Sequence, residues 1–179
     1  ENSFLALSQT DKAISINLSV FDIERDEIRE CIYTLLQTYQ KESHRIVFEL
    51  LESDDIKDFN LIKTFIQSVK RFGVKIAIDD FGTGYSNIAY LQNFPVDKLK
   101  FDRSFVIAGQ ESEGGREILR AMVGLAKALN MDVLAEGVET NTQEKMLLEV
   151  GVEKVQGFAY AKPMPEHDFL LLLKNQKPH

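Results

Sequence analysis

The sequence KIAIDDFGTGYS, residues 75–86, decides the fold. Its first part, Ile76–Ile78, is apolar at every position, which is typical of a strand that is buried on both faces of a parallel sheet. Asp79 and Asp80 follow this strand directly. Two adjacent carboxylates in such a place repel each other and lose hydration, so they need a cation or hydrogen-bond donors to be stable there. The stretch therefore predicts a buried strand that ends at a charged site.

The second part of this stretch, Asp80–Ser86, is rich in glycine. It lacks the Gly-Lys-Ser/Thr ending of a phosphate-binding P-loop and the third glycine of a dinucleotide-binding fingerprint. We interpret it as a flexible turn that carries two aromatic residues, Phe81 and Tyr85. These could stack on a nucleobase or pack into a neighbouring chain.

The same order of strand and helix recurs on both sides of residues 75–86. Short β-branched runs alternate with longer stretches of helical period, which indicates repeated strand–helix units around a parallel sheet. The predicted strands are Ala13–Leu18, Ile46–Leu50, Lys75–Asp79, Lys98–Asp102, Asp132–Glu136 and Lys154–Phe158. The predicted helices are Glu24–Tyr39, Asp58–Phe72, Arg116–Leu129, Thr140–Gly151 and a last one from Pro165 to about Leu173, followed by a frayed tail over residues 174–179. Either a barrel or an open doubly wound sheet fits this pattern, and the polar residues must distinguish them.

The composition predicts one globular domain in the cytoplasm. Of the 179 residues, 44% are apolar and 27% are charged, and this length can bury a sizeable core. We expect no membrane contact, because no apolar run could span a bilayer and no basic-then-apolar leader is visible. The single cysteine, Cys31, fits a reducing compartment. The net charge of −7 argues against binding to duplex nucleic acid, which requires a basic patch.

Nearly every predicted strand ends in a residue that can bind an ion. In a parallel barrel all strand carboxyl ends open on one face, where residues distant in sequence converge on the active site. Carboxylates with an amide oxygen suit Mg²⁺ or Mn²⁺, and a set this large could hold two ions that cleave a phosphodiester. The three histidines are too scattered to favour zinc. The strand-end residues are Asn17, Glu49, Asp79, Asp80, Lys100, Glu136 and Gln156.

Three of the charged residues also have simpler interpretations. Glu52 could solvate the mouth of a loop and favour the start of the next helix, and Glu139 could be a helix-entry charge. Lys100 alternates with apolar neighbours and should face the barrel interior, where the acidic cluster supplies its counter-charge. It could also form a plain salt bridge.

Several motifs together resemble the EAL-domain family of cyclic di-GMP phosphodiesterases. They occur in family order and spacing, and they are Ile16–Ser19, Phe48–Ser53, Asp79–Ser86, Leu99–Phe105, Ala135–Thr140 and Gln156–Phe158. The resemblance implies a TIM-barrel-like (β/α) fold and hydrolysis of cyclic di-GMP to linear pGpG with two Mg²⁺ or Mn²⁺ ions. Ca²⁺ is a further, inhibitory occupant.

The resemblance also implies roles for individual residues. The metal ligands it implies are Asn17, Glu49, Asp79, Asp80 and Glu136, and Asp80 and Gln156 also lie at the substrate. Lys100 orients the attacking water, and Glu139 lies near that water. Glu52 anchors the loop Asp80–Ser86, beside which family members commonly form a homodimer.

One part of the family pattern is missing from these 179 residues. Family domains begin with two further strands, the second of which carries Glu-x-Leu, and Phe4–Leu7 looks instead like the end of the helix that follows them. We therefore expect about six of the eight barrel strands in a single domain, with poor stability and little hydrolysis by this chain alone. The alternatives to an enzyme are a receptor that binds cyclic di-GMP without cleaving it and an interaction module.

Overall fold

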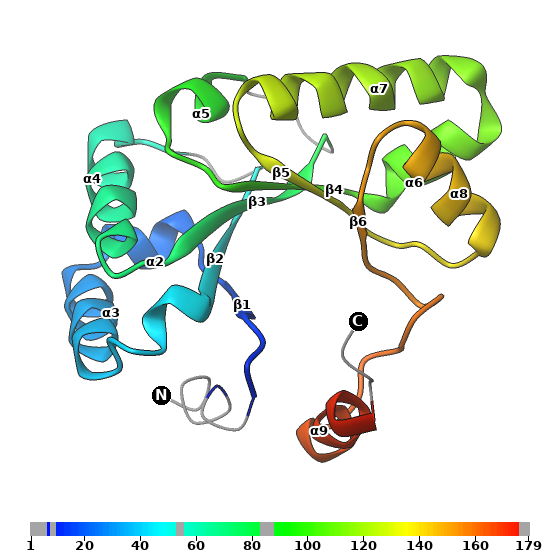
Figure 1. The fold of residues 1–179 in the computed structure, drawn as a ribbon. Helices are drawn as coiled ribbons and strands as arrows, with labels where there is room; N and C mark the ends of the chain where they lie inside the picture. Colours follow the sequence, from blue (N-terminus) through cyan, green and yellow to red (C-terminus); the bar gives the residue numbers. More distant parts are fainter. Residues whose placement is uncertain (1–6, 8–9, 53–55, 83–87, 176–179) are drawn as a thin grey trace.

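Six parallel strands form one curled sheet in the computed structural model, which describes residue 7 and residues 10–52, 56–82 and 88–175 (Figure 1). The order of the strands in the sheet follows their order in the chain, β1 to β6. The strands are β1 (Ile14–Asn17), β2 (Ile46–Leu51), β3 (Lys75–Phe81), β4 (Lys98–Phe101), β5 (Asp132–Ala135) and β6 (Lys154–Val155). All six predicted strands are therefore present, although several end one or more residues earlier than predicted. The last is shorter by three residues at its end, so Gln156 lies just beyond it.

Most helices lie around the outer side of the curled sheet, while α9 lies apart, at the open side of the curl (Figure 1). The helices are α2 (Val20–Glu24), α3 (Asp26–Thr38), α4 (Phe59–Lys70), α5 (Ile88–Asn93), α6 (Arg103–Glu111), α7 (Glu113–Ala128), α8 (Asn141–Glu149) and α9 (Glu166–Asn175), with a 3₁₀ turn at Ser43–Arg45. The sequence did not predict α2, α5 or α6. The last helix continues to Asn175, two residues beyond its predicted end, and residues 176–179 lie outside the described part.

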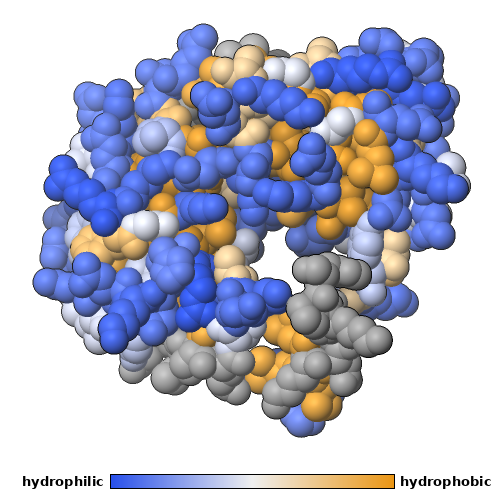
Figure 2. All heavy atoms as spheres, viewed as in Figure 1, coloured by the Kyte–Doolittle hydropathy of each residue, from blue (hydrophilic) through white to orange (hydrophobic). Residues whose placement is uncertain are grey.

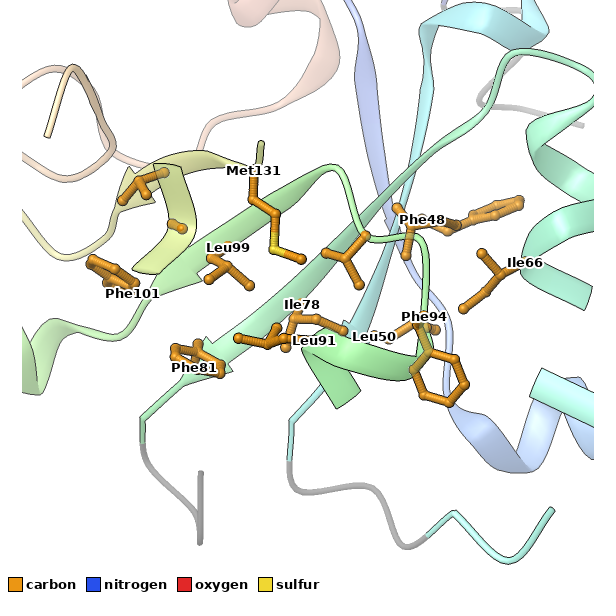
Figure 3. Packing of buried hydrophobic residues seen from close by; sticks show 14 of the residues in the cluster. Phe48, Leu50, Ile66, Ile78, Phe81, Leu91, Phe94, Leu99, Phe101 and Met131 are labelled. Carbon is orange, nitrogen blue, oxygen red and sulfur yellow. The ribbon is translucent and has the colours of Figure 1, made fainter. Parts of the chain in front are cut away.

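Alternation along the strands separates an apolar outer face from a polar inner face. The outer-facing residues of β2 to β5 belong to the hydrophobic core: Phe48, Leu50, Ile76, Ile78, Leu99, Phe101, Val133 and Ala135. Figure 3 shows how Ile78 and Leu99 lie beside Leu91 of α5, while Phe48 lies near Ile66 of α4. Because side chains alternate with a period of two, the residues between them point to the concave side. The polar strand residues therefore converge inside the curl.

The helix starts follow capping rules that the sequence displays. Asp58 accepts a hydrogen bond from the Leu61 amide at the start of α4, and Ser112 does the same for Gly115 at the start of α7. Thr140 and Gln143 form a reciprocal capping box at α8. These caps fix the residue at which each helix begins. They therefore also fix where the loops that carry the polar residues end.

The two edges of the sheet, β1 and β6, are not paired with each other. The only described ladders join consecutive strands from β1 to β6, and Figure 2 shows an opening between the two ends of the curl. Beyond β6 the chain runs to α9, and a cavity of ≈ 560 Å³ lies between α9 and the end of β6. Its lining includes Phe158 and Phe169, which are 57% and 44% exposed. The described half-barrel is thus open on one side.

Candidate active site

Lys100 is the centre of a charged cluster on the concave face of the sheet. Its ammonium lies 2.7 Å from Oε2 of Glu49, 2.8 Å from Oδ1 of Asp79 and 2.9 Å from Oε1 of Glu136. Three different segments supply these carboxylates: β2, β3 and the residue after β5. Only 5% of Lys100 is exposed, so the ion pairs are largely shielded from water. The sequence correctly predicted that this lysine faces inward toward the acids.

A β-bulge brings the two adjacent aspartates toward the same cluster. The ladder between β3 and β4 pairs Ile78 with Leu99 and then Phe81 with Phe101, so β3 contains one extra residue. In a regular strand Asp79 and Asp80 would point to opposite faces. At the bulge Asp80 has a positive φ of 52°, and ligand oxygens of Asp79, Asp80 and Glu136 all lie within 4.8 Å of one another. The backbone therefore departs from regular geometry where the carboxylates have to meet.

The electrostatics of this cluster favour binding of a cation. Burial raises the pKa of Glu136, and the nearby charges of Asp79 and Glu49 add to this, although Lys100 partly opposes them. The pKa of Asp80 is raised by burial and by Asp79 and Asp102. Repulsion of this kind means that one lysine does not compensate all the carboxylates. Oxygen donors in such an arrangement fit a hard divalent cation.

The pKa of Lys100 is also raised, but in spite of burial and by hydrogen bonds. Burial alone would lower it, but the hydrogen bonds to Asp79, Glu49 and Glu136 outweigh burial and raise the pKa above its usual value. The side chain is therefore a cation at any physiological pH. All three N–H donors of its ammonium are matched by carboxylate oxygens.

The remaining predicted residues lie around this cluster at different depths. Asn17 is exposed at the end of β1 and is level with Glu49 in the ladder. Gln156 follows β6, where its amide donates to the Ala135 carbonyl. Gln156 and Glu139 line a second cavity, of ≈ 200 Å³, together with Glu136 and Phe158. These residues are thus on the same side of the sheet as Lys100, whose ion pairs of 2.7 to 2.9 Å are with Glu49, Asp79 and Glu136.

Glu52 holds the backbone immediately after Asp80. Its Oε2 accepts a hydrogen bond of 2.6 Å from the Gly82 amide, and its own amide donates to the Asp79 carbonyl. Glu52 is 5% exposed, and its Oε1 has no partner among the described residues. The predicted contact with the Asp80–Ser86 loop is present at Gly82. Residues 83–87, where the predicted dimer contact lies, are outside the described residues.

Sequence reasoning did not single out Arg103, Gln110 or Gln143. Arg103 begins α6 and forms an ion pair of 2.9 Å with Glu139. Gln143 is buried, and its side chain hydrogen-bonds to the backbone of Glu139 and Thr140 and to Gln110. The spacing Thr140-x-x-Gln143 was a readable signal, because it is that of a capping box.

The family follows from the match of most of the sequence to a family model. Residues 2–163 match the family described as EAL domain. The chain belongs to the EAL domain family. In that family the fold is TIM-barrel-like, and the six parallel strands of this chain form a curled part of such a barrel.

Three similar proteins illustrate the relationship. The Escherichia coli protein named probable cyclic di-GMP phosphodiesterase PdeN is 39% identical over 166 residues, which make up 92% of this chain and 31% of PdeN. The crystal structure of the EAL domain of Mycobacterium smegmatis DcpA is 35% identical and superposes with a TM-score of 0.84 over 93% of this chain and 75% of that one. A manganese and cyclic di-GMP complex of Klebsiella pneumoniae BlrP1 is 29% identical, with a TM-score of 0.78 over 88% of this chain and 41% of that one.

The chain corresponds to only part of these proteins. It covers 20% of the Bacillus subtilis signaling protein YkoW, to which it is 33% identical. Among the described residues no helix is both long and apolar enough to cross a membrane.

Proposed function

We propose that the intact protein hydrolyses cyclic di-GMP to linear pGpG at the Lys100 cluster. The observation that carries this proposal is the convergence of Glu49, Asp79 and Glu136 on one buried lysine at the carboxyl ends of parallel strands. Active sites of parallel barrels lie at this face. The names of PdeN and of the BlrP1 complex support cyclic di-GMP as the substrate.

The residues of the cluster fit two divalent cations, Mg²⁺ or Mn²⁺. The ligands would be Asn17, Glu49, Asp79, Asp80 and Glu136, and Ca²⁺ would occupy the same oxygens without supporting turnover. When bound, such ions lower the pKa of a water molecule and stabilise the leaving oxygen of a phosphodiester. The manganese complex of BlrP1 supports this choice of metal.

Lys100 would hold the attacking water in line with the phosphorus. Each of its three N–H donors faces a carboxylate in this structure, and the same carboxylates would hold the cations, which would free the lysine to donate to water. Gln156 and Asp80 would bind the substrate, with Phe158 in the same cavity as Gln156. Glu52 would act indirectly, by holding the Gly82 amide and hence the turn after Asp80.

The test is to incubate the intact protein with cyclic di-GMP and Mn²⁺ and to separate pGpG by chromatography. We expect Glu136→Ala to lower turnover at least about 10³-fold, because it removes a metal ligand and not a core contact. Lys100→Met should also abolish turnover. Glu149→Gln, at an exposed position in α8, is the control and should leave the rate unchanged.

Two outcomes would contradict the proposal in different ways. Hydrolysis by Glu136→Ala within tenfold of the wild type would show that the cluster is not the active site. Binding of cyclic di-GMP by the wild type without any product would instead favour the receptor hypothesis.

A further inference from the structure

Helix α6 contacts the segment Glu136–Thr140 at its first residue and contacts Gln143 of α8 near its last residue. At the first residue of α6, the guanidinium of Arg103 pairs with Oε1 of Glu139 at 2.9 Å. Near its last residue, Oε1 of Gln110 accepts a hydrogen bond of 3.0 Å from Nε2 of Gln143. The segment between β5 and α8 is therefore joined to α6 directly through Arg103 and indirectly through Gln143 of α8.

Gln143 makes more contacts than helix capping requires. A capping box needs one hydrogen bond from the Thr140 amide to the side chain at this position, and Gln143 accepts that bond at 3.1 Å. The same oxygen also accepts a shorter bond of 2.8 Å from the Glu139 amide. Gln143 is only 7% exposed, so its loss would leave both amides without their acceptor. These contacts fix the backbone of Glu139 as well as the start of α8.

Arg103 fixes the same segment through its aliphatic stem. Gly137 has a φ of +69°, and a Cβ at this glycine would lie 2.5 Å from Cγ of Arg103. The stem of the arginine therefore occupies the space next to the Gly137 backbone. The charged end continues to Glu139, so one side chain contacts two positions of the segment.

The ion pair between Arg103 and Glu139 contributes little to folding stability. The two side chains are 54% and 38% exposed, and pairs this exposed are screened by water and stabilise a folded protein only slightly. The ion pair instead sets the direction of the Glu139 carboxylate. It holds this carboxylate at the rim of the cavity that Glu136, Gln156 and Phe158 line.

We propose that Arg103 and Gln143 are positioning residues that fix Glu139 beside the Lys100 cluster. Arg103 orients the carboxylate, and Gln143, supported by Gln110, fixes the backbone. The inference rests on the proposed hydrolysis, and on the family resemblance, which implies that Glu139 lies close to the reacting water.

The kinetic test compares Arg103→Met, Gln143→Leu and Gln143→Glu in the intact protein. We expect the first two to lower kcat by about 10- to 100-fold while KM changes by less than about threefold, because they displace Glu139 without removing a substrate contact. Gln143→Glu keeps the acceptor for both amides and should retain most of the activity. Arg103→Lys should recover part of the loss seen in Arg103→Met. Glu111→Gln, an exposed residue of the same helix, is the matched control.

A second measurement does not depend on activity. Amide hydrogen exchange, resolved by residue with NMR, should become faster at Glu139 and Thr140 in Gln143→Leu but not in Gln143→Glu. Unchanged exchange at the core amides of α7 would show that the variant remains folded.

The outcomes separate this inference from the proposed function. A wild-type protein that does not hydrolyse cyclic di-GMP overturns the proposed function, and the inference falls with it. If the wild type is active, three results overturn the inference alone. Arg103→Met and Gln143→Leu keep kcat within about twofold, or their loss of activity appears in KM instead of kcat. The third result is that amide exchange at Glu139 does not change in Gln143→Leu.

Discussion

Gly82 illustrates how a single residue can limit the site. Its φ is +98°, a conformation that L side chains rarely adopt, and a Cβ there would lie 1.8 Å from Cε2 of Phe105. Phe105 packs on Phe101 with the ring centroids 5.4 Å apart, so its ring cannot move away without disturbing the core. The Gly82 amide donates to Glu52. A glycine is therefore required where the chain turns away from Asp80.

We expect Gly82→Ala to lower the free energy of unfolding by about 2–4 kcal/mol, from the strained φ together with the overpacking. Urea denaturation measures this. Gly124→Ala is the matched control, since a Cβ there meets nothing within 4 Å in the interior of α7. The control should stabilise the protein by up to about 1 kcal/mol, because alanine favours a helix. Equal effects of the two substitutions would refute the steric argument.

The sequence predicts some site residues better than others for a physical reason. Glu49, Asp79, Lys100 and Glu136 could be placed together because strand ends of a parallel sheet share one edge. The bulge that redirects Asp80 could not be predicted, since it depends on the register between β3 and β4. No pattern within one strand reveals that register.

At the scale of elements, the weakest junction of the sheet is the edge strand β6. It has two residues, and its pairing with β5 is supplemented by an ion pair of 2.5 Å between Lys154 and Asp132. The hydrogen bond from Lys154 lowers the pKa of Asp132 below its usual 3.8. A carboxyl whose pKa is lower in the folded state stabilises the protein above its unfolded pKa, and this contribution is lost as the pH falls through the folded value.

We therefore expect Asp132→Asn to reduce stability at pH 7, and the difference from the wild type to shrink as the pH falls below about 3.8. The pair is about half exposed, so the reduction should be at most about 1 kcal/mol. Urea denaturation between pH 7 and pH 3 measures it. Asp11→Asn removes a looser, 3.6 Å pair outside the sheet and should change nothing. If the difference in the free energy of unfolding between Asp132→Asn and the wild type grows toward pH 3, the lowered pKa of Asp132 is contradicted.

The elements that sequence reasoning missed are short or poorly marked. α6 and α7 are separated only by Ser112, and α7 begins at Glu113, three residues before the predicted start at Arg116. The structure explains Gly115, because a Cβ there would lie 2.0 Å from the Ala108 carbonyl of α6. The glycine thus marks a close contact between two helices. A single sequence cannot distinguish this from a helix break.

At the scale of the whole molecule, the concave face contains the charges and the open side of the curl exposes apolar surface. Unpaired strand edges promote association with other chains. Here β1 and β6 are such edges, and Phe158, Tyr160 and Phe169 are exposed beside β6 or on α9. A half-barrel of this kind gains stability when further chain covers its edges.

We expect the 179-residue chain on its own to self-associate and to show little hydrolysis. Sedimentation velocity over a range of concentrations measures the first, and the pGpG assay measures the second. A stable monomer with full activity would contradict this expectation. Activity restored by a separate peptide that adds to the sheet would support the role of the open edges.

The sequential order of the strands has a consequence for synthesis of the chain. Each strand pairs with the one made just before it, so the sheet can grow in the direction of translation. A nascent chain that has completed β3 already carries Glu49 and Asp79, but Lys100 lies 51 residues after Glu49. Addition of β4 brings a positive charge to two carboxylates that repel each other, and this attraction favours the correct docking of β4. We therefore expect the charge of Lys100 to favour the docking of β4 beside Glu49 and Asp79 during folding.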